Sequence, residues 1–452
     1  MEKYDLTKGK MIHHLKRIAI PASMGYLFNT LYNVVDTFYA GKISTQALAG
    51  LTVSFPIFFI VIALTSGLGG GLTALSAIAL GKNDDHDFHQ LSRNGLLLGL
   101  LAAMIVTLWS KPIINSLLSL TGATGQAHLE AYNYTKVILW GSLFFIMNGI
   151  LNGILNAQGD TRTYRNFLII GFFLNLILDP LLIFGWLGLP KLGTTGVALA
   201  TVIIQALGMV YLIYRTLKSP IFNYRLFKTT KLALSTCLSL LKQALPSSLN
   251  MSTIALGVFV INYFVLFYGQ PATLAGYGAA VRIEQLALLP ALGLNVAVLT
   301  ITGQNYGKKN YKNIRTVFKL SLLIGCGIMV LGGLVIYPLA PWLIGLFNKD
   351  SEVITAGSQY LRIEVWAFMS YIFLNIIISS MQGFKKPGFA VIIGLYRQIL
   401  LPVIVFYLLG TVYKLRILGV WWGIVAINWS AVAISLIYYY TQLGQVKEDL
   451  LE

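Results

Sequence analysis

Twelve long apolar segments follow one another along the 452-residue sequence. A transmembrane helix needs about 20 consecutive, mostly apolar residues, and each segment supplies them. Only 11% of the residues are charged, whereas soluble proteins have about 25%. The segments begin near Leu15, Leu48, Leu91, Leu129, Thr163, Gly193, Cys237, Leu274, Ile314, Val353, Phe389 and Leu418. The sequence therefore predicts an all-α integral membrane protein with twelve transmembrane helices.

The positions of Lys and Arg predict how these helices are oriented. Most of the 33 basic residues lie at the two ends of the chain and in every second connection between apolar segments. Such residues concentrate in cytoplasmic loops. We therefore expect cytoplasmic N- and C-termini, in the plasma membrane of a prokaryote. The net charge of +17 does not indicate a nucleic-acid partner, because the basic residues lie in short loops between membrane segments.

An internal repeat relates the two halves of the chain. Pro21 matches Pro246, and Gly67-Leu68 matches Gly293-Leu294 at nearly the same offset. Each half has six helices, an even number, so the two pseudo-symmetric bundles share one orientation, as in alternating-access transporters. The predicted parts are an N-terminal bundle over 1–216, a basic cytoplasmic linker over 217–236 and a C-terminal bundle over 237–452.

Two carboxylates lie inside apolar segments of the first bundle. Asp36 follows Asn29 and Asn33 at positions i, i+4 and i+7, and Asp179 follows Asn175 by one helical turn. A carboxylate at the middle of the bilayer costs at least ~2.5 kcal/mol, so it is usually paired or functional. Neighbouring segments add polar stripes with Asn148, Asn152, Asn156, Thr201 and Gln205.

Such a pair of acids has two possible uses. Two ionised carboxylates repel each other strongly in a low-dielectric cavity. The site can therefore take up a proton. Alternatively, carboxylate, amide and hydroxyl oxygens form a cage that suits a small metal cation. The residues alone leave both uses open.

Four motifs, in this order, resemble those of the multidrug and toxic compound extrusion (MATE) transporters. They are Asn33-Val-Val-Asp36-Thr-Phe, Asn156-Ala-Gln-Gly-Asp160-Thr, Asn175-X3-Asp179-Pro-Leu-Leu-Ile-Phe184 and Gly303-Gln-Asn-Tyr-Gly307. The resemblance covers essentially the whole chain, and the two acids of the first bundle are similar to the DinF-type branch. It implies a MATE-like fold and export of amphiphilic, often cationic, compounds in exchange for protons, with sodium possible. No cofactor other than this coupling ion is expected.

The resemblance also implies which residues couple ion flow to transport. The implied coupling residues, which could also hold sodium, are Asp36, Asn175, Asp179 and Thr201, with Asn152 close by and Asn33 as a secondary candidate. The NorM-type branch places an acid in its seventh helix, where this chain has Asn250 and Asn262 but no carboxylate. Pro21 removes a backbone hydrogen bond from the first helix, and we expect the resulting kink to act in gating.

The second bundle has intramembrane charges of its own. We interpret Glu284 and Arg397 as a structural ion pair, with a second proton site as the alternative. Arg362 and Glu364 are expected near a helix end, either as a structural pair or with side chains that reach toward the membrane surface.

Two other functions are compatible with a membrane fold. A flippase for lipid-linked sugars needs a cavity rich in Arg and Lys to hold pyrophosphate, and the first bundle has none in mid-membrane. An intramembrane enzyme needs a nucleophile or metal set, such as a His cluster or a paired-Asp protease motif, and the sequence has neither. We therefore expect a monomeric transporter and not an enzyme. The expected partners of this transporter are drug-like compounds, a coupling cation and the lipid bilayer.

Overall fold

A computed structural model describes residues 5–120 and 125–451 of the chain. The described residues form helices and no strand. Those of the first half are α1 (Met11–Ile43), α2 (Thr45–Gly81), α3 (Asp85–Leu108), α4 (Ser110–Leu120), α5 (Gly125–Trp140), α6 (Ser142–Ala157), α7 (Arg162–Phe184), η1 (Trp186–Gly188), α8 (Thr194–Leu217) and α9 (Tyr224–Thr229). Those of the second half are α10 (Leu234–Tyr268), α11 (Pro271–Gly307), α12 (Tyr311–Gly345), α13 (Ser351–Glu364), α14 (Phe368–Gly383), α15 (Gly388–Leu395), η2 (Tyr396–Leu400), α16 (Leu401–Tyr407), η3 (Leu408–Val412) and α17 (Ile417–Leu451).

The number of membrane-spanning helices agrees with the sequence pattern. Nine described helices are long and apolar enough to cross a membrane, and two bent pairs raise the number to eleven. The pairs are α5 with α6, bent by 48°, and α13 with α14, bent by 54°. α1 has 33 residues, long enough to cross a membrane, but it is not among these eleven and would be the twelfth. The predicted all-α membrane fold is therefore confirmed.

The packing divides the chain into two compact units, which are described separately. The first consists chiefly of Met24–Ser248, and the second of Leu6–Ser23 together with Leu249–Glu452. Both divisions lie two residues beyond a proline inside a long helix, namely Pro21 in α1 and Pro246 in α10. The first parts of these helices therefore belong to a different unit from their remainders. By its packing, the predicted linker over 217–236 lies within the first unit. The division of the chain into two functional bundles at that linker stays a prediction.

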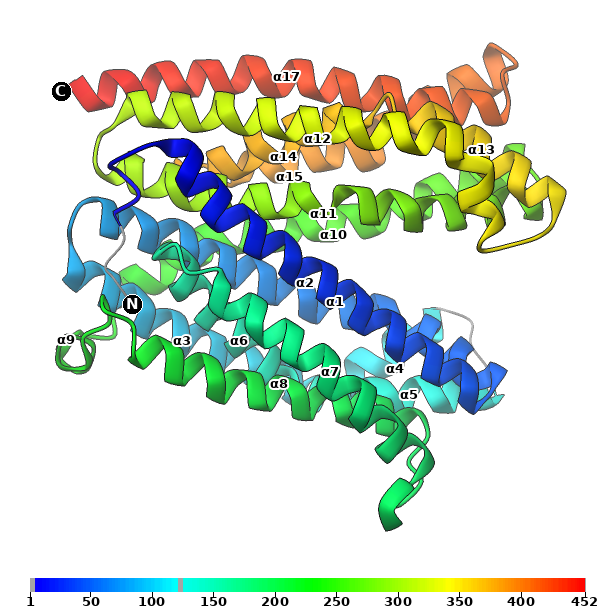
Figure 1. Cartoon of the computed structure of the whole chain (residues 1–452), viewed down its shortest axis with the longest axis horizontal. Helices are drawn as coiled ribbons and strands as arrows, with labels where there is room; N and C mark the ends of the chain where they lie inside the picture. The colour runs from blue at the N-terminus through cyan, green and yellow to red at the C-terminus, as the bar shows by residue number, and fades with distance from the viewer. Residues whose placement is uncertain (1–4, 121–124, 452) are drawn as a thin grey trace. The chain divides into compact units, whose positions relative to one another are not determined.

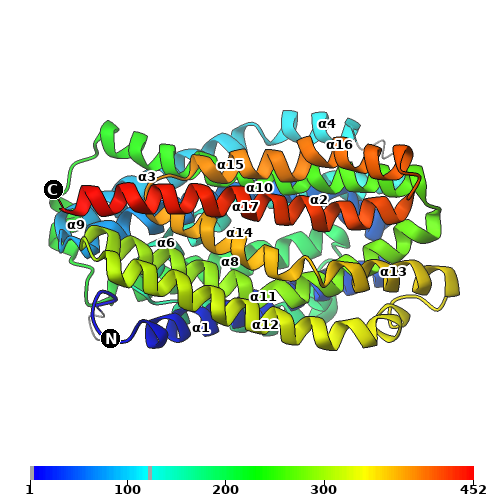
Figure 2. The same ribbon diagram turned by 90° about the horizontal axis from the view of Figure 1, so that it is seen from above.

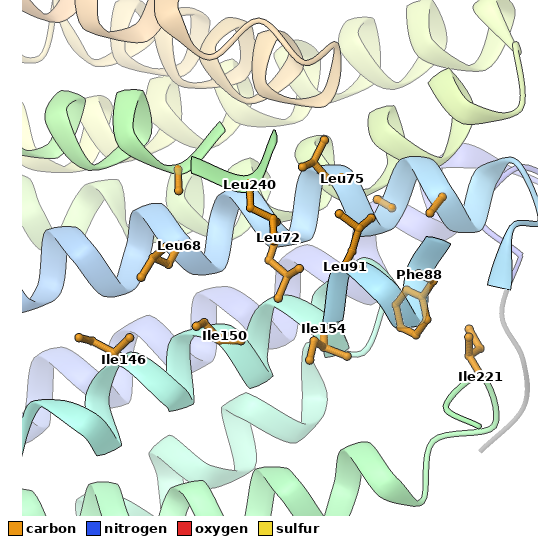
Figure 3. Close-up of a cluster of buried hydrophobic side chains, with 14 of the residues drawn as sticks. Leu68, Leu72, Leu75, Phe88, Leu91, Ile146, Ile150, Ile154, Ile221 and Leu240 are labelled. Carbon is orange, nitrogen blue, oxygen red and sulfur yellow. The ribbon is translucent and has the colours of Figure 1, made fainter. Parts of the chain in front are cut away.

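The core of the first unit lies between α2, α3 and α6. Figure 3 shows Leu68 and Leu72 of α2 on the side that faces Ile146 and Ile150 of α6. The two helices approach closely at glycines, because a Cβ added to Gly69 would lie 2.5 Å from a backbone oxygen of α6. The glycine run of α2 thus serves helix packing. Alongside this core, α7 packs against α8 (Figure 1), and these two helices carry three of the predicted site residues.

In the second unit, α11 packs against α12, α13 and α14, and α17 packs against α14 (Figure 2). The chain segment before α1 is held by amides of α11 and α12. The Asn305 side chain donates to the Leu6 carbonyl at 3.2 Å, and Asn313 donates to the Thr7 carbonyl at 2.9 Å. Gln304 accepts from the Leu6 amide at 3.2 Å. Two residues of the Gly303–Gly307 motif therefore have a structural role.

Candidate ion-coupling site

Asp36 lies on α1 and is 5% exposed, within the first unit. Its carboxylate is held from two other helices. The Asn175 amide, on α7, donates to Oδ1 at 2.9 Å, and Thr201 Oγ1, on α8, lies 3.5 Å from Oδ2. The Thr201 hydroxyl also lies 3.1 Å from the Val197 carbonyl, which is the better acceptor for its one hydrogen. Asn175 is therefore the principal donor to Asp36.

Asp179 is fully buried near the end of α7, and its carboxyl group lies against that of Asp36. Among the described residues, neither oxygen of Asp179 has a hydrogen-bond donor. A buried carboxylate without a donor is costly in a low-dielectric interior. A proton held by either acid would donate to the other, and a small cation would neutralise both. The geometry therefore favours a pair of acids that binds either a proton or a small cation.

Sequence reasoning did not single out Tyr32, which lies one helical turn before Asp36 on α1. Its hydroxyl is buried, and it makes no hydrogen bond to the described residues, although it lies beside Thr201. The spacing from Asp36 was the available signal. Together with the oxygens of Asp36, Asp179 and Asn175, the Tyr32 hydroxyl completes a small polar site inside the helices.

The remaining candidates of the first unit are not bonded to this acid pair. The Asn33 side chain is exposed and donates to the Asn29 carbonyl of its own helix. Asn152 has a buried amide oxygen with no donor among the described residues. Asn148 donates to the backbone and side-chain oxygens of Gln205, at 2.8 and 2.7 Å, and so joins α6 to α8.

The chemistry of the site fits a proton or a monovalent cation. Over the described ranges, no group of three or more His, Cys, Asp or Glu side chains is placed to hold a metal ion. The site therefore consists of two carboxylates surrounded by neutral amide and hydroxyl groups. Sodium, if bound, would use the oxygens of Asp36, Asn175, Asp179 and Thr201.

The intramembrane charges of the second unit have hydrogen-bond partners that the sequence did not indicate. Glu284 accepts a hydrogen bond from Tyr360 at 2.9 Å, and Arg397 donates to Asn428 at 3.1 Å. The two charges attract each other electrostatically, and their structural ion pair stays a prediction. Arg362 lies over the Tyr337 ring and donates to its carbonyl. Residues two apart on a helix point to different sides, which is why Arg362 does not pair with the buried Glu364.

The membrane-spanning helices define this chain as an integral membrane protein, and the buried acid pair is its candidate ion site. The MatE family model matches twice, over residues 21–181 and 246–408, and these two matches correspond to the two halves. The chain belongs to the MatE family. It is therefore a multi-pass membrane protein and not an enzyme.

Relatives and solved structures agree over nearly the whole chain. A probable multidrug resistance protein, YoeA of Bacillus subtilis, is 27% identical over 442 residues, covering 95% of this chain and 93% of its own length. The multidrug export protein MepA of Staphylococcus aureus is 24% identical and covers 96% and 95%. A MOP superfamily transporter from Pyrococcus furiosus has a TM-score of 0.92 at 26% identity, with 99% of both chains covered. A MATE structure in the bent conformation has a TM-score of 0.93 at 26% identity, with 100% of both covered.

Proposed function

We propose that this chain exports amphiphilic, often cationic, drug-like compounds in exchange for protons, by alternating access. The observation that carries this proposal is the buried pair of Asp36 and Asp179, in which the second acid has no donor among the described residues. The names of YoeA and MepA support drug export rather than transport of a lipid-linked sugar. The cytoplasmic position of both termini is part of the same proposal.

The coupling follows from the charge of the acid pair. A proton that enters from outside converts one carboxylate to a donor for the other and removes one buried negative charge. The helices α1, α7 and α8 can then repack around a less charged site. Loss of the proton to the cytoplasm restores the charge and favours the opposite form. The free-energy difference between the two conformations changes with the protonation state of the acid pair, and this change drives the exchange.

Pro21 gives α1 a means to bend, because proline removes a backbone hydrogen bond inside the helix. The division between units falls two residues beyond this proline, so the two parts of α1 belong to different packed bodies. The solved structures similar to this chain include a MATE protein in a bent and in a straight conformation. We infer that bending of α1 near Pro21 opens or closes access to Asp36, which lies in the part of the helix after this proline.

The proposal is tested by drug efflux from proteoliposomes under an imposed pH gradient or an imposed sodium gradient. We expect the pH gradient to drive efflux by the natural chain and to fail with Asp36→Asn or Asp179→Asn. The matched control is Asp350→Asn, which removes an exposed carboxylate but keeps a side chain that can cap α13. Efflux that responds only to sodium, or full proton-driven efflux by Asp36→Asn, would refute proton coupling at this pair.

A further inference from the structure

The segment that joins α8 to α10 is basic and contains no acid. The sequence has no acidic residue between Asp179 and Glu284, and the stretch 215–242 holds six basic residues. They are Arg215, Lys218, Arg225, Lys228, Lys231 and Lys242. All of them except Arg215 are exposed. This segment therefore presents positive charge and has no carboxylate of its own to balance it.

The backbone of the same segment is held in place by α3, against which α9 packs (Figure 1). Arg93 donates to the Lys228 carbonyl at 3.1 Å. Asn94 donates to the Lys231 carbonyl at 3.3 Å and accepts from the Ala233 amide at 3.0 Å. These bonds use main-chain atoms only, so that the side chains of Lys228 and Lys231 stay exposed.

These contacts also fix the level of the segment relative to the membrane. Residues 85–94 of α3 are mostly polar, and its apolar run begins at Gly95, directly after Asn94. The start of an apolar run marks the boundary between headgroups and hydrocarbon. Since Asn94 binds Lys231 and Ala233, the segment lies at the headgroup level of the bilayer.

Apolar side chains are exposed among these charges. Tyr224 of α9 is 63% exposed, and Leu232 and Leu234 are 53% and 77% exposed. Lysine beside exposed aromatic and aliphatic residues is typical of segments that lie in the membrane interface. The connection between α11 and α12 is also basic, but no large apolar side chain is exposed between Leu292 and Leu323. Charge alone is enough to orient membrane helices, so the apolar residues of the α8–α10 segment need another explanation.

We propose that the α8–α10 segment is a binding surface for anionic phospholipids. Its Lys and Arg side chains contact headgroup phosphates, and Tyr224, Leu232 and Leu234 contact the upper part of the acyl chains. Because α3 already holds the backbone, little conformational entropy is lost when lipid binds. The proposed cytoplasmic position of the segment makes the inner leaflet the source of this lipid. Any effect of the lipid on drug exchange rests on the proposed function, whereas lipid binding does not.

The first test is native mass spectrometry of the purified full chain with phosphatidylglycerol or phosphatidylcholine of identical acyl chains. The linker variant combines Arg225→Gln, Lys228→Gln and Lys231→Gln. The control combines Lys308→Gln, Lys309→Gln and Lys312→Gln, which removes the same charge from exposed positions of the α11–α12 connection. Both variants should fold, because the substituted side chains are exposed and α3 bonds only the main chain of the linker.

We expect the linker variant to bind phosphatidylglycerol at least about fivefold more weakly, which is the effect of one basic residue at an anionic surface. The control should lose much less, and phosphatidylcholine binding should be the same in all three proteins. An equal loss in both variants, or no loss in the linker variant, would overturn the proposal. Displacement of the lipid by inorganic phosphate would also overturn it, since it would indicate a site for free phosphate.

A second test follows the exposed ring of α9 in the bilayer. Tyr224→Cys is labelled with a fluorophore in a chain whose Cys237 and Cys326 are replaced by Ser, in vesicles of equal parts phosphatidylglycerol and phosphatidylcholine. Bromine on the acyl chains of one lipid or the other quenches the label in proportion to the local amount of that lipid. We expect stronger quenching by brominated phosphatidylglycerol, and equal quenching once the three linker substitutions are added.

Equal quenching by the two brominated lipids without those substitutions would refute local enrichment of the anionic lipid. Drug efflux is measured separately on the same vesicles. A chain that shows this enrichment but exports no drug would contradict the proposed function and leave the lipid-binding surface intact.

Discussion

Asn175→Ala removes the one short hydrogen bond to Asp36 while both acids remain. The Asn175 amide donates to Asp36 Oδ1 at 2.9 Å from a fully buried position on α7. The other contact to Asp36, from Thr201 at 3.5 Å, is longer, and that hydroxyl has the Val197 carbonyl as an alternative acceptor. The variant therefore changes how strongly the ionised pair is stabilised, with little change in its charge.

The size and sign of the effect follow from this bond. A hydrogen bond to a charged group contributes about 1.5–3 kcal/mol. A factor of ten in proton affinity corresponds to about 1.4 kcal/mol, so the loss should tighten proton binding by about 10- to 100-fold. The donated bond favours the ionised carboxylate, and without it the site releases its proton to the cytoplasm only at higher pH. The half-maximal point of efflux against cytoplasmic pH should therefore move upward by about one to two pH units.

The assay is drug efflux from proteoliposomes, with the pH on the cytoplasmic side varied and the outer pH held constant. The matched control is Asn148→Ala, which also removes a buried amide of the first unit, but one that bonds Gln205 and not the acids. We expect Asn148→Ala to leave the pH profile of efflux unchanged, although it can lower the amount of folded protein. If Asn175→Ala keeps the natural pH profile, or moves it downward, the hydrogen bond to Asp36 does not tune the coupling site.

Three further outcomes follow from the helices around the site. Pro21→Ala should reduce efflux at matched expression with little loss of folded protein, and unchanged efflux would show that bending at Pro21 has no part in gating. Gly69→Ala places a Cβ 2.5 Å from a backbone oxygen of α6 and should lower stability by about 1–3 kcal/mol in thermal unfolding, whereas Gly70→Ala has open space and should not. In a cysteine-free background, Lys349→Cys should react with an impermeant thiol reagent in intact cells and Lys309→Cys should not; the reverse pattern would overturn the orientation.

The sequence predicts the membrane helices and the candidate acids, because both depend on how apolar and polar residues alternate along the chain. Apolar runs gave the twelve helices, since the bilayer fixes their length. Asp36, Asn175 and Asp179 were found because charged and amide side chains are rare inside such runs and because the MATE motifs place them in order. The structure then joins Asn175 and Thr201 to Asp36, whereas Asn33 and Asn152 are left outside that hydrogen-bonded set.

Features that depend on tertiary packing could not be predicted. The sequence placed Glu364 near a helix end, either paired with Arg362 or reaching toward the membrane surface. It is instead buried beside the bend between α13 and α14, where Tyr371 donates to it. The hydrogen bonds from Tyr360 to Glu284 and from Arg397 to Asn428 join different helices and have no signal in the sequence. The division of α1 and α10 between two packed units also has no local signal beyond the prolines that precede it.

The central claim is that a proton leaves the pair of Asp36 and Asp179 when the transporter takes up its substrate. The direct measurement is the number of protons released into weakly buffered solution when a cationic drug is added to purified protein, with and without sodium. We predict proton release by the natural chain that sodium does not abolish, and its reduction in the Asp36→Asn and Asp179→Asn variants. Drug binding with no proton release, or release that both variants retain in full, would contradict the account.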